Sequence, residues 1–280
     1  MAAIAVKRLQ FKTGNMEALS TMQHLGDQVR ADLADLIDLQ MSPLGLAAMD
    51  ALAPTSGQTV LDIGCGAGET VLQLADRVGA TGRVVGVDIA PRVLAVARIR
   101  TAHLKQVALL QEDAADLSLA SRSVDSAFSR FGTMFFAEPT RAFSNIRRTL
   151  KHGGRIGFVC WRSMRENELD LFPVEAAGLP VTIDATPFSF ENADTINRVL
   201  QTAGFESIAV DAHDAYISSG DTDTMLKVIT HVGALGKVLR ETPELLPKAG
   251  PRVRAALSAR EKDGKVSLKA ATWIVTATAT

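Results

Sequence analysis

A glycine-rich loop that directly follows a short apolar run constrains the fold of this chain most strongly. Residues 60–70 read Val-Leu-Asp-Ile-Gly-Cys-Gly-Ala-Gly-Glu-Thr, and the residues after them have the apolar spacing of a helix. Glycines at alternate positions let the backbone turn tightly and let a ligand lie against the main chain. A strand, such a loop and a helix begin the nucleotide-binding half of a doubly wound α/β sheet. The segment therefore predicts a cofactor site at the end of a buried strand.

The spacing of the glycines restricts the cofactor. Nicotinamide and flavin sites use G-x-G-x-x-G with a pyrophosphate at the helix N-terminus, whereas Gly64, Gly66 and Gly68 are spaced G-x-G-x-G. Glu69 stands where the third glycine of that fingerprint would fall, and its carboxylate would repel a pyrophosphate. A P-loop has Lys followed by Ser or Thr after its last glycine, and no such pair follows Gly68. A cofactor without phosphate fits this loop best.

Strands and helices alternate regularly between residues 59 and 161. Apolar runs predict strands at 59–63, 83–87, 107–110, 124–128 and 155–161, and helices at 69–78, from 91 onward and at 138–150. His-Gly-Gly at 152–154 predicts a turn before the fifth strand. Strands joined by helices of this length imply right-handed crossovers and a parallel sheet. Ligands of such sheets bind outside the carboxyl ends of the strands, so the residues that follow each strand form one candidate site.

Asp88 is the second strong feature, because it follows the second strand. It lies close to the spacing of about 20 residues beyond the glycine loop at which an acid accepts hydrogen bonds from ribose hydroxyls. Its alternative role is the N-cap of the helix that begins at Pro91. The two roles are compatible.

Several motifs in one order resemble the class I S-adenosylmethionine-dependent methyltransferases. Besides the glycine loop, they are Ser-Val-Asp-Ser-Ala-Phe-Ser-Arg-Phe-Gly at 123–132 and Leu-Lys-His-Gly-Gly-Arg-Ile at 150–156, where His152 replaces the usual proline. The chain is most similar to bacterial small-molecule enzymes related to the ubiquinone/menaquinone C-methyltransferase group. Ser-Arg-Phe-Gly-Thr-Met-Phe-Phe-Ala-Glu-Pro at 129–139 and Val-Cys-Trp-Arg at 159–162 carry the likeness to one branch of that group.

The resemblance implies a Rossmann-like, doubly wound α/β fold. Its seven-stranded sheet is mostly parallel, and strand seven is antiparallel between strands five and six. Residues 208–212 and 272–278 are the expected sixth and seventh strands, and a helix at 193–203 ends at Gly204. We expect a helical N-terminal lid over residues 1–50, with a helical run at 28–39, and a methyltransferase domain over 51–280. A helical insertion at 221–260, with helices at 225–239 and 243–259, separates strands six and seven.

The resemblance also implies S-adenosylmethionine as the cofactor, which becomes S-adenosylhomocysteine. Asp113 is expected to accept a hydrogen bond from the adenine amino group, and Asp116 competes for that role. The expected cofactor-binding residues are Asp62, Gly64, Cys65, Gly66, Gly68, Thr70, Asp88, Ile89, Asp113, Ala114, Ser129, Arg130 and Phe131. Met134, Phe135 and Trp161 are expected to line the substrate pocket, with ordinary core packing as the alternative. The Tyr-Trp pair that relatives carry near the N-terminus is missing, since no Trp precedes Trp161.

No catalytic residue stands out in the sequence. Methyl transfer depends mainly on alignment, and a strong general base is needed only for a weakly acidic acceptor. His24 is a weak candidate because it lies in the expected lid. His213 and His231 are further alternatives, whereas His103 and His152 are expected to be structural.

The composition of the chain limits the kinds of partner that it is expected to bind. A net charge of −1 without long single-sign runs argues against nucleic acid, and no apolar run is long enough for a membrane span. No Cys/His cluster has metal-ligand spacing, and two cysteines indicate a reducing cytoplasm and are too few for arsenic methylation. We expect a small-molecule acceptor and allow a homodimer through the insertion. The alternatives are a non-methylating or regulatory S-adenosylmethionine-binding protein and an NAD-dependent oxidoreductase, which Glu69 disfavours.

Overall fold

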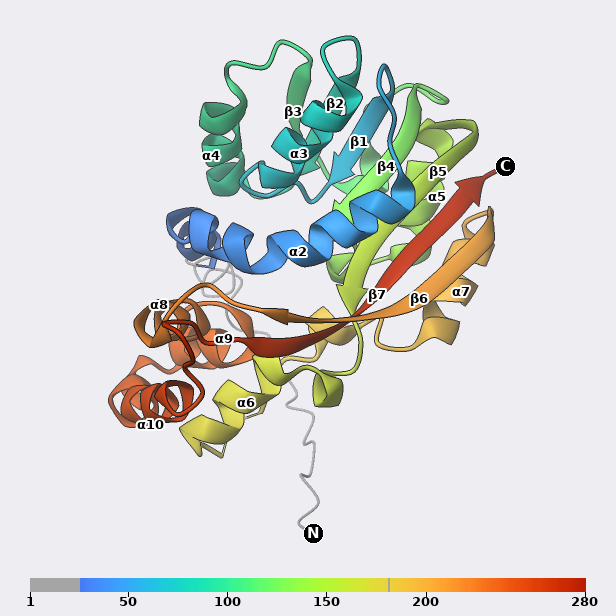
Figure 1. The fold of residues 1–280 in the computed structure, drawn as a ribbon. Coiled ribbons are helices and arrows are strands. Elements are labelled where there is room, and N and C mark those ends of the chain that lie inside the picture. The colour runs from blue at the N-terminus through green and yellow to red at the C-terminus, as the bar shows by residue number, and fades with distance from the viewer. Residues whose placement is uncertain (1–25, 181) are drawn as a thin grey trace, which may run out of the picture.

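The computed structural model describes residues 26–180 and 182–280, which fold around one central sheet (Figure 1). Within these residues the sheet has seven strands in the order β3-β2-β1-β4-β5-β7-β6. The strands are β1 (Thr59–Ile63), β2 (Arg83–Asp88), β3 (Val107–Gln111), β4 (Val124–Arg130), β5 (Leu150–Trp161), β6 (Phe205–Ile217) and β7 (Leu268–Ala279). β1 to β5 pair in parallel, and β7 is antiparallel to both β5 and β6. The expected fold class is confirmed.

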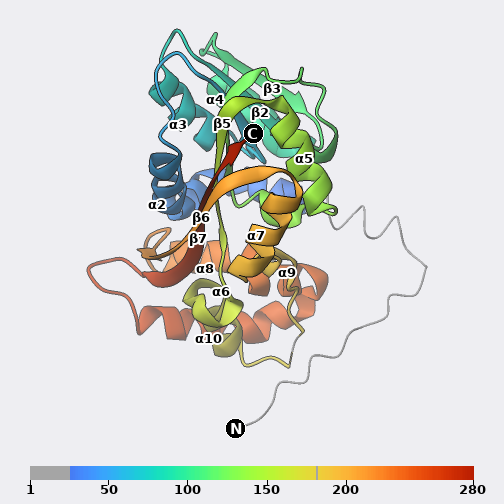
Figure 2. The same cartoon turned by 90° about the vertical axis from the view of Figure 1, so that its right-hand side faces the viewer.

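Helices cover both faces of the sheet, as Figure 2 shows. α2 (Ala34–Leu52), α3 (Glu69–Val78) and α4 (Pro91–Thr101) lie on one face, and α5 (Pro139–Thr149) and α7 (Ala193–Thr202) lie on the other. α3 illustrates why these segments are helices that pack on the sheet. Four of its five buried residues are apolar and recur with helical spacing, whereas Glu69, Gln73, Asp76 and Arg77 of the same helix are polar.

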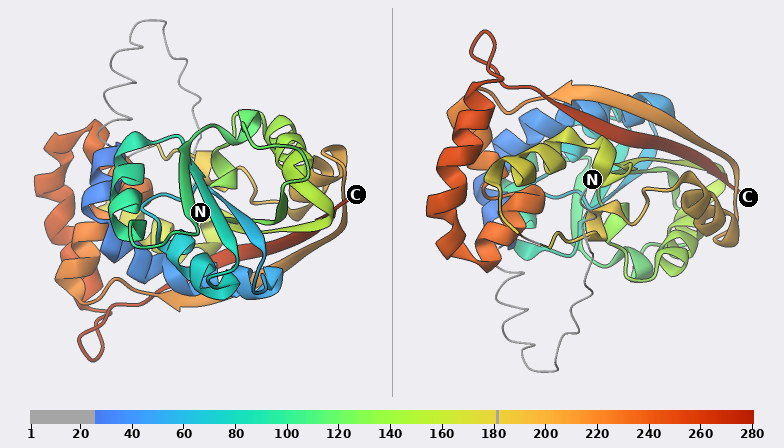
Figure 3. Two further views of the ribbon diagram at one scale, coloured as in Figure 1. Left: turned by 90° about the horizontal axis from the view of Figure 1, so that it is seen from above. Right: turned by 90° about the horizontal axis from the view of Figure 1, so that it is seen from below.

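Four further helices form what we call the helical cluster, beside α2 in Figures 1 and 3. They are α6 (Glu168–Ala177), α8 (Thr222–Ile229), α9 (Gly233–Glu241) and α10 (Leu246–Ser258). α6 packs against α9 and α10, and α8 contacts α2. Three of the four come from the expected insertion. The cluster therefore places the insertion next to the carboxyl ends of the parallel strands.

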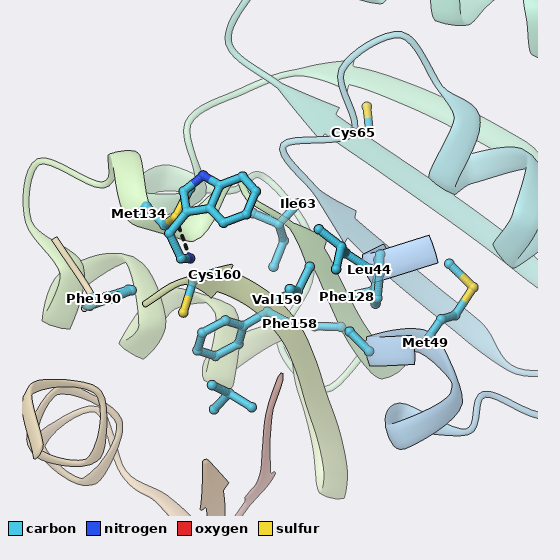
Figure 4. Packing of buried hydrophobic residues seen from close by; sticks show 14 of the residues in the cluster. Leu44, Met49, Ile63, Cys65, Phe128, Met134, Phe158, Val159, Cys160 and Phe190 are labelled. Carbon is cyan, nitrogen blue, oxygen red and sulfur yellow. Dashed lines mark hydrogen bonds between the residues drawn. The ribbon is translucent and has the colours of Figure 1, made fainter. Parts of the chain in front are cut away.

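The core joins α2 to the middle of the sheet. Leu44 and Met49 of α2 and Phe128 and Phe158 of the sheet are fully buried, and Figure 4 shows them in one cluster. Gly157 allows this close approach, because a Cβ there would lie 2.7 Å from the Cβ of Leu52. The second half of α2 is thus part of the core.

Some element boundaries differ from the sequence predictions. β5 begins at Leu150 rather than 155, and the expected turn at 152–154 is a bulge between the pairs Val124–Leu150 and Ser126–Arg155. The helix expected at 225–239 is two helices, α8 and α9, because the chain turns at 230–232 and Gly233 has a φ of 76°. The helical run at 28–39 is interrupted at Leu33, and β6 and β7 extend beyond the expected 208–212 and 272–278.

None of the helices in the described ranges has the length and apolar character needed to cross a membrane.

Candidate active site

A cavity of about 1150 Å³ lies between the carboxyl ends of the strands and the helical cluster. Its lining comes from the glycine loop, the ends of β2, β4 and β5, the first half of α2, and helices α6 and α9. Ligand pockets usually measure about 300–1,000 Å³. The cavity is therefore large enough to hold two ligands side by side.

Most of the expected site residues meet at this cavity. The lining includes Gly64, Cys65, Gly66, Thr70, Asp88, Ile89, Asp113, Ala114, Arg130, Phe131, Met134, Phe135 and Trp161. Asp62, Gly68 and Ser129 do not line it. Ser129 is fully buried and donates to the Ile63 carbonyl at 2.7 Å, so it ties β4 to β1. His24 lies outside the described residues, His213 does not line the cavity, and His231 does.

The structure explains why each of these three loop positions is occupied by glycine. A Cβ on Gly64 would lie 3.0 Å from the Cα of Gly132, and one on Gly68 would lie 2.9 Å from the Cβ of Ala97. Gly66 has a φ of 53° and nothing within 4 Å of where its Cβ would be. The first and third glycines therefore permit close packing, and Gly66 leaves bare backbone at the cavity wall. A ligand that lies against main chain fits such a surface.

Asp62 is buried beneath the glycine loop and binds Thr70 at the start of α3. Its Oδ2 accepts a hydrogen bond from the Thr70 hydroxyl at 2.5 Å, whereas its Oδ1 is buried without a partner. Burial raises the pKa of Asp62 to about 7, although the hydrogen bond from Thr70 and the charge of Arg130 act in the opposite direction. An unsatisfied buried carboxyl beneath the cavity wall suits a site that receives a cation.

Asp88 connects the glycine loop to the start of α4. Its Oδ2 accepts from the Gly66 amide and its Oδ1 from the Ala90 amide, both at 2.9 Å. Ala90 is the N-cap of α4, so the alternative role of Asp88 as the N-cap is wrong, and its side chain instead closes a turn with the Ala90 amide. Burial raises the pKa of Asp88, while these two backbone amides lower it.

The acids beyond β3 lie at the rim of the cavity. Asp113 is exposed, and its Oδ1 accepts from the Ala115 amide at 2.8 Å at the start of a short 3₁₀ helix. Asp113 lines the cavity and Asp116 does not. Asp113 and Asp116 were the alternatives for binding the adenine amino group, and only Asp113 is in a position to contact a ligand in the cavity.

Arg130 is held by carboxylates rather than facing the cavity unpaired. Its guanidinium donates to Asp38 Oδ1 at 2.7 Å and also to Glu69. Asp38 Oδ2 accepts from Arg100 at 2.7 Å, and Arg100 donates to the Ala67 carbonyl at 3.1 Å. We call these residues, with Asp35, the α2 ion-pair network. The network links α2, the glycine loop, α4 and β4. Asp38 could not be predicted from the sequence, since nothing in a helical pattern marks one acid as the partner of a distant arginine.

Phe131 and Trp161 form an aromatic wall at the ends of β4 and β5. Their ring centroids lie 4.1 Å apart with an interplanar angle of 23°. Phe131 has a φ of 59°, which is unusual for a bulky residue and often occurs near functional sites. Met134 lies behind this wall, and its sulfur accepts from the Trp161 amide at 3.3 Å. Phe135 is more exposed, at 53%.

Comparison with known proteins identifies the family. A family model described as a methyltransferase domain matches residues 61–158. The 2-phytyl-1,4-naphtoquinone methyltransferase of Thermosynechococcus vestitus is 30% identical over 210 residues, which cover 68% of this chain and 92% of that protein. Aklanonic acid methyltransferase DauC of Streptomyces sp. (strain C5) is 34% identical over 119 residues, 42% of this chain and 54% of that protein. The chain thus spans about half the length of DauC.

A solved structure supports the fold. The S-adenosylmethionine-dependent methyltransferase of Aquifex aeolicus has a TM-score of 0.52 at 16% sequence identity, with 93% of this chain and 98% of that chain covered. The chain belongs to the class I S-adenosylmethionine-dependent methyltransferases, in the group related to the ubiquinone and menaquinone methyltransferases.

Proposed function

We propose that this protein transfers the methyl group of S-adenosylmethionine to a small-molecule acceptor that binds in the same cavity. The observation that carries the proposal is the shape of that cavity. It joins the bare backbone at Gly66 to an aromatic wall, and its volume of about 1150 Å³ leaves room for a second ligand. Family membership and the named activities of the relatives, which act on a quinone and on aklanonic acid, support the same reaction class.

The residues around the loop would hold the cofactor. We assign the backbone of Gly64 to Gly66 to the methionine end, Asp88 to the ribose hydroxyls, and Asp113 with Ala114 to the adenine. Ile89, which is 67% exposed beside Asp88, would pack against the adenine ring. We assign Arg130 an indirect role, because its guanidinium is already paired with Asp38 and Glu69.

Positioning would provide most of the catalysis. When bound, S-adenosylmethionine supplies a methyl group on a positively charged sulfur. Phe131, Met134 and Trp161 would orient the acceptor and exclude water from the reacting atoms. Holding reactants in line can lower a barrier by roughly 7–11 kcal/mol. A dedicated general base is then not required unless the acceptor is weakly acidic.

The proposal also covers the cellular compartment, the oligomeric state and the class of acceptor. Cys65 and Cys160 are free thiols, which fits a reducing cytoplasm. The helical cluster would form the contact surface of a homodimer. The acceptor is a small molecule and not a nucleic acid, which fits the net charge of −1.

Calorimetry with S-adenosylhomocysteine tests the proposal. We expect micromolar binding, and we expect Asp88→Ala to weaken it by roughly ten- to a hundredfold, because hydrogen bonds to a charged group are lost. Asp211→Ala is the matched control, since Asp211 is an exposed acid on β6 away from the cavity. Failure of the wild-type protein to bind either form of the cofactor would exclude the function. Binding without release of S-adenosylhomocysteine for any acceptor would favour a non-methylating role.

A further inference from the structure

We propose that Asp170 of α6 binds a protonated amine of the acceptor, and that the acceptor is therefore a cationic amine. The inference rests on the proposed function, because it concerns the second ligand of the same cavity. Asp170 lines this cavity from the side of the helical cluster. No sequence motif marks it.

The carboxyl of Asp170 is fixed in place through one of its two oxygens. Oδ1 accepts a hydrogen bond from the Ala234 amide at 3.0 Å, at the start of α9. Gly233 permits this approach, because it has a φ of 76° and a Cβ there would lie 2.9 Å from Oδ1. The contact joins two helices that are 64 residues apart in the chain. The contact between α6 and α9 therefore holds the Asp170 carboxyl in a fixed position.

The second oxygen is available to a ligand. Oδ2 makes no hydrogen bond with any described residue, and it is not among the fully buried polar atoms. Protein surrounds the side chain closely and burial raises the pKa of Asp170, which the Ala234 amide partly opposes. A side chain enclosed in this way keeps its remaining accessible surface toward the cavity that it lines.

No described cation neutralises Asp170. No basic side chain on the packed helices or on the neighbouring strand pairs with it. Lys237 pairs with Asp184, Arg240 donates to the His231 carbonyl, Arg252 donates to the Ala177 carbonyl, Arg254 pairs with Asp223, Arg260 pairs with Glu168, and Lys269 pairs with Asp214, while Lys248 is exposed and forms no ion pair with Asp170. A buried carboxylate without a counter-ion carries a desolvation cost that a cationic ligand offsets. The charge balance thus favours a cation over a neutral or anionic group.

The walls of the cavity favour the same ligand. The stacked pair Phe131–Trp161 and the rings of Phe135, Phe136 and Phe188 line the cavity. Aromatic faces attract ammonium groups. A charge-assisted hydrogen bond from the amine to Oδ2 would be roughly twice as strong as a neutral one. Asp170 and the aromatic residues thus line one cavity, and both favour an ammonium group as the ligand.

A charge series tests the inference. The probes are benzylamine, benzyl alcohol and benzoate, which share a ring and differ in charge. Their binding to the protein saturated with S-adenosylhomocysteine is measured by ligand-observed NMR. We expect benzylamine to bind roughly tenfold more tightly than benzyl alcohol, with benzoate the weakest. Asp170→Asn, which keeps an oxygen for the Ala234 amide, should remove this preference.

Asp184→Asn is the matched control. Asp184 also lines the cavity, but Lys237 neutralises it at 2.5 Å, so this variant should keep the preference for benzylamine. The inference fails if the wild-type protein binds benzyl alcohol or benzoate at least as well as benzylamine. It also fails if Asp170→Asn keeps the preference, or if no probe binds. Because the wild-type series is decisive alone, a poorly folded variant does not block the test. Calorimetry with S-adenosylhomocysteine separates these outcomes from failure of the proposed function.

Discussion

Phe131 shows how a single residue is held at the active-site cavity against its own backbone preference. Its positive φ of 59° costs an L residue with a Cβ about 1–2 kcal/mol. The amide of Phe131 donates to the Val159 carbonyl at 3.0 Å, and its ring stacks on Trp161. These contacts with β5 offset the strain, so the aromatic wall is maintained by tertiary structure.

This strain makes a prediction about small residues at position 131. Phe131→Gly and Phe131→Ala both remove the ring, but only alanine keeps the cost of a Cβ at positive φ. We expect the glycine variant to have a free energy of unfolding about 1 kcal/mol higher than the alanine variant. Denaturant unfolding measures the difference. At Phe136, which has a φ of −63°, the order should reverse because glycine loses more entropy on folding. The same order at both positions would contradict the account.

Asp62 predicts a pH dependence of cofactor binding. Its pKa of about 7 in the folded, ligand-free protein lies above the ordinary value of 3.8. A bound cation above the loop stabilises the carboxylate and lowers this pKa. The complex then holds fewer protons than the free protein, so affinity rises with pH up to about 7 and levels off above it. Below pH 7, calorimetry in two buffers of different ionisation enthalpy should detect proton release. Asp62→Asn should remove it, and a pH-independent affinity for the wild-type protein would refute this role.

At the scale of elements, α2 has two functions along its length. Its second half packs on β5 and belongs to the core, whereas Asp35 and Asp38 of its first half belong to the α2 ion-pair network. Through Arg100 and Arg130 this network reaches Ala67 and Glu69 of the glycine loop. The helix and the loop are therefore expected to move together.

Breaking the network at Arg130 should affect both stability and binding. Arg130→Met leaves Glu69 and one oxygen of Asp38 without a cation in a largely buried setting. We expect a loss of about 3 kcal/mol in the free energy of unfolding and weaker binding of S-adenosylhomocysteine. Arg254→Met is the control, because it breaks an exposed pair with Asp223 and should cost about 0–1 kcal/mol. Equal losses of unfolding free energy in the two variants would show that the α2 ion-pair network contributes no more to stability than an exposed ion pair.

At the scale of the whole molecule, two thiols report on different kinds of opening. Cys65 is buried on the glycine loop and lines the cavity, whereas Cys160 is fully buried in β5, an interior strand of the sheet (Figure 4). Burial raises the pKa of both thiols, so neither reacts readily in the closed protein. Their labelling rates therefore measure how often each region opens.

We expect a thiol reagent to modify Cys65 faster than Cys160, with a weaker dependence on denaturant, because loops open locally while central strands open with the whole fold. S-adenosylhomocysteine at a hundred times its dissociation constant should slow labelling of Cys65 by about a hundredfold. Mass spectrometry separates the two sites. Equal rates and equal denaturant dependence would mean that the loop opens only when the molecule unfolds.

Local patterns in the chain predicted much of this structure. The bounds of β1 and α3 agree with the sequence prediction, because a short apolar run, alternate glycines and a helical stripe are set by neighbouring residues. The bulge in β5 and the break between α8 and α9 were not predicted, because glycine permits several conformations and packing selects one of them. The roles of the individual site residues in cofactor binding stay predictions.

The sequence by itself determined the doubly wound α/β class, the strand that carries the loop and a preference for a cofactor without phosphate. These depend on periodicity and glycine spacing, which act over a few residues. Only the tertiary structure paired Arg130 with Asp38, 92 residues away, and Asp170 with the Ala234 amide. Such contacts depend on how helices from distant segments pack over one cavity. The charge and burial of the side chains that line the cavity were decided there, because both are properties of the assembled fold.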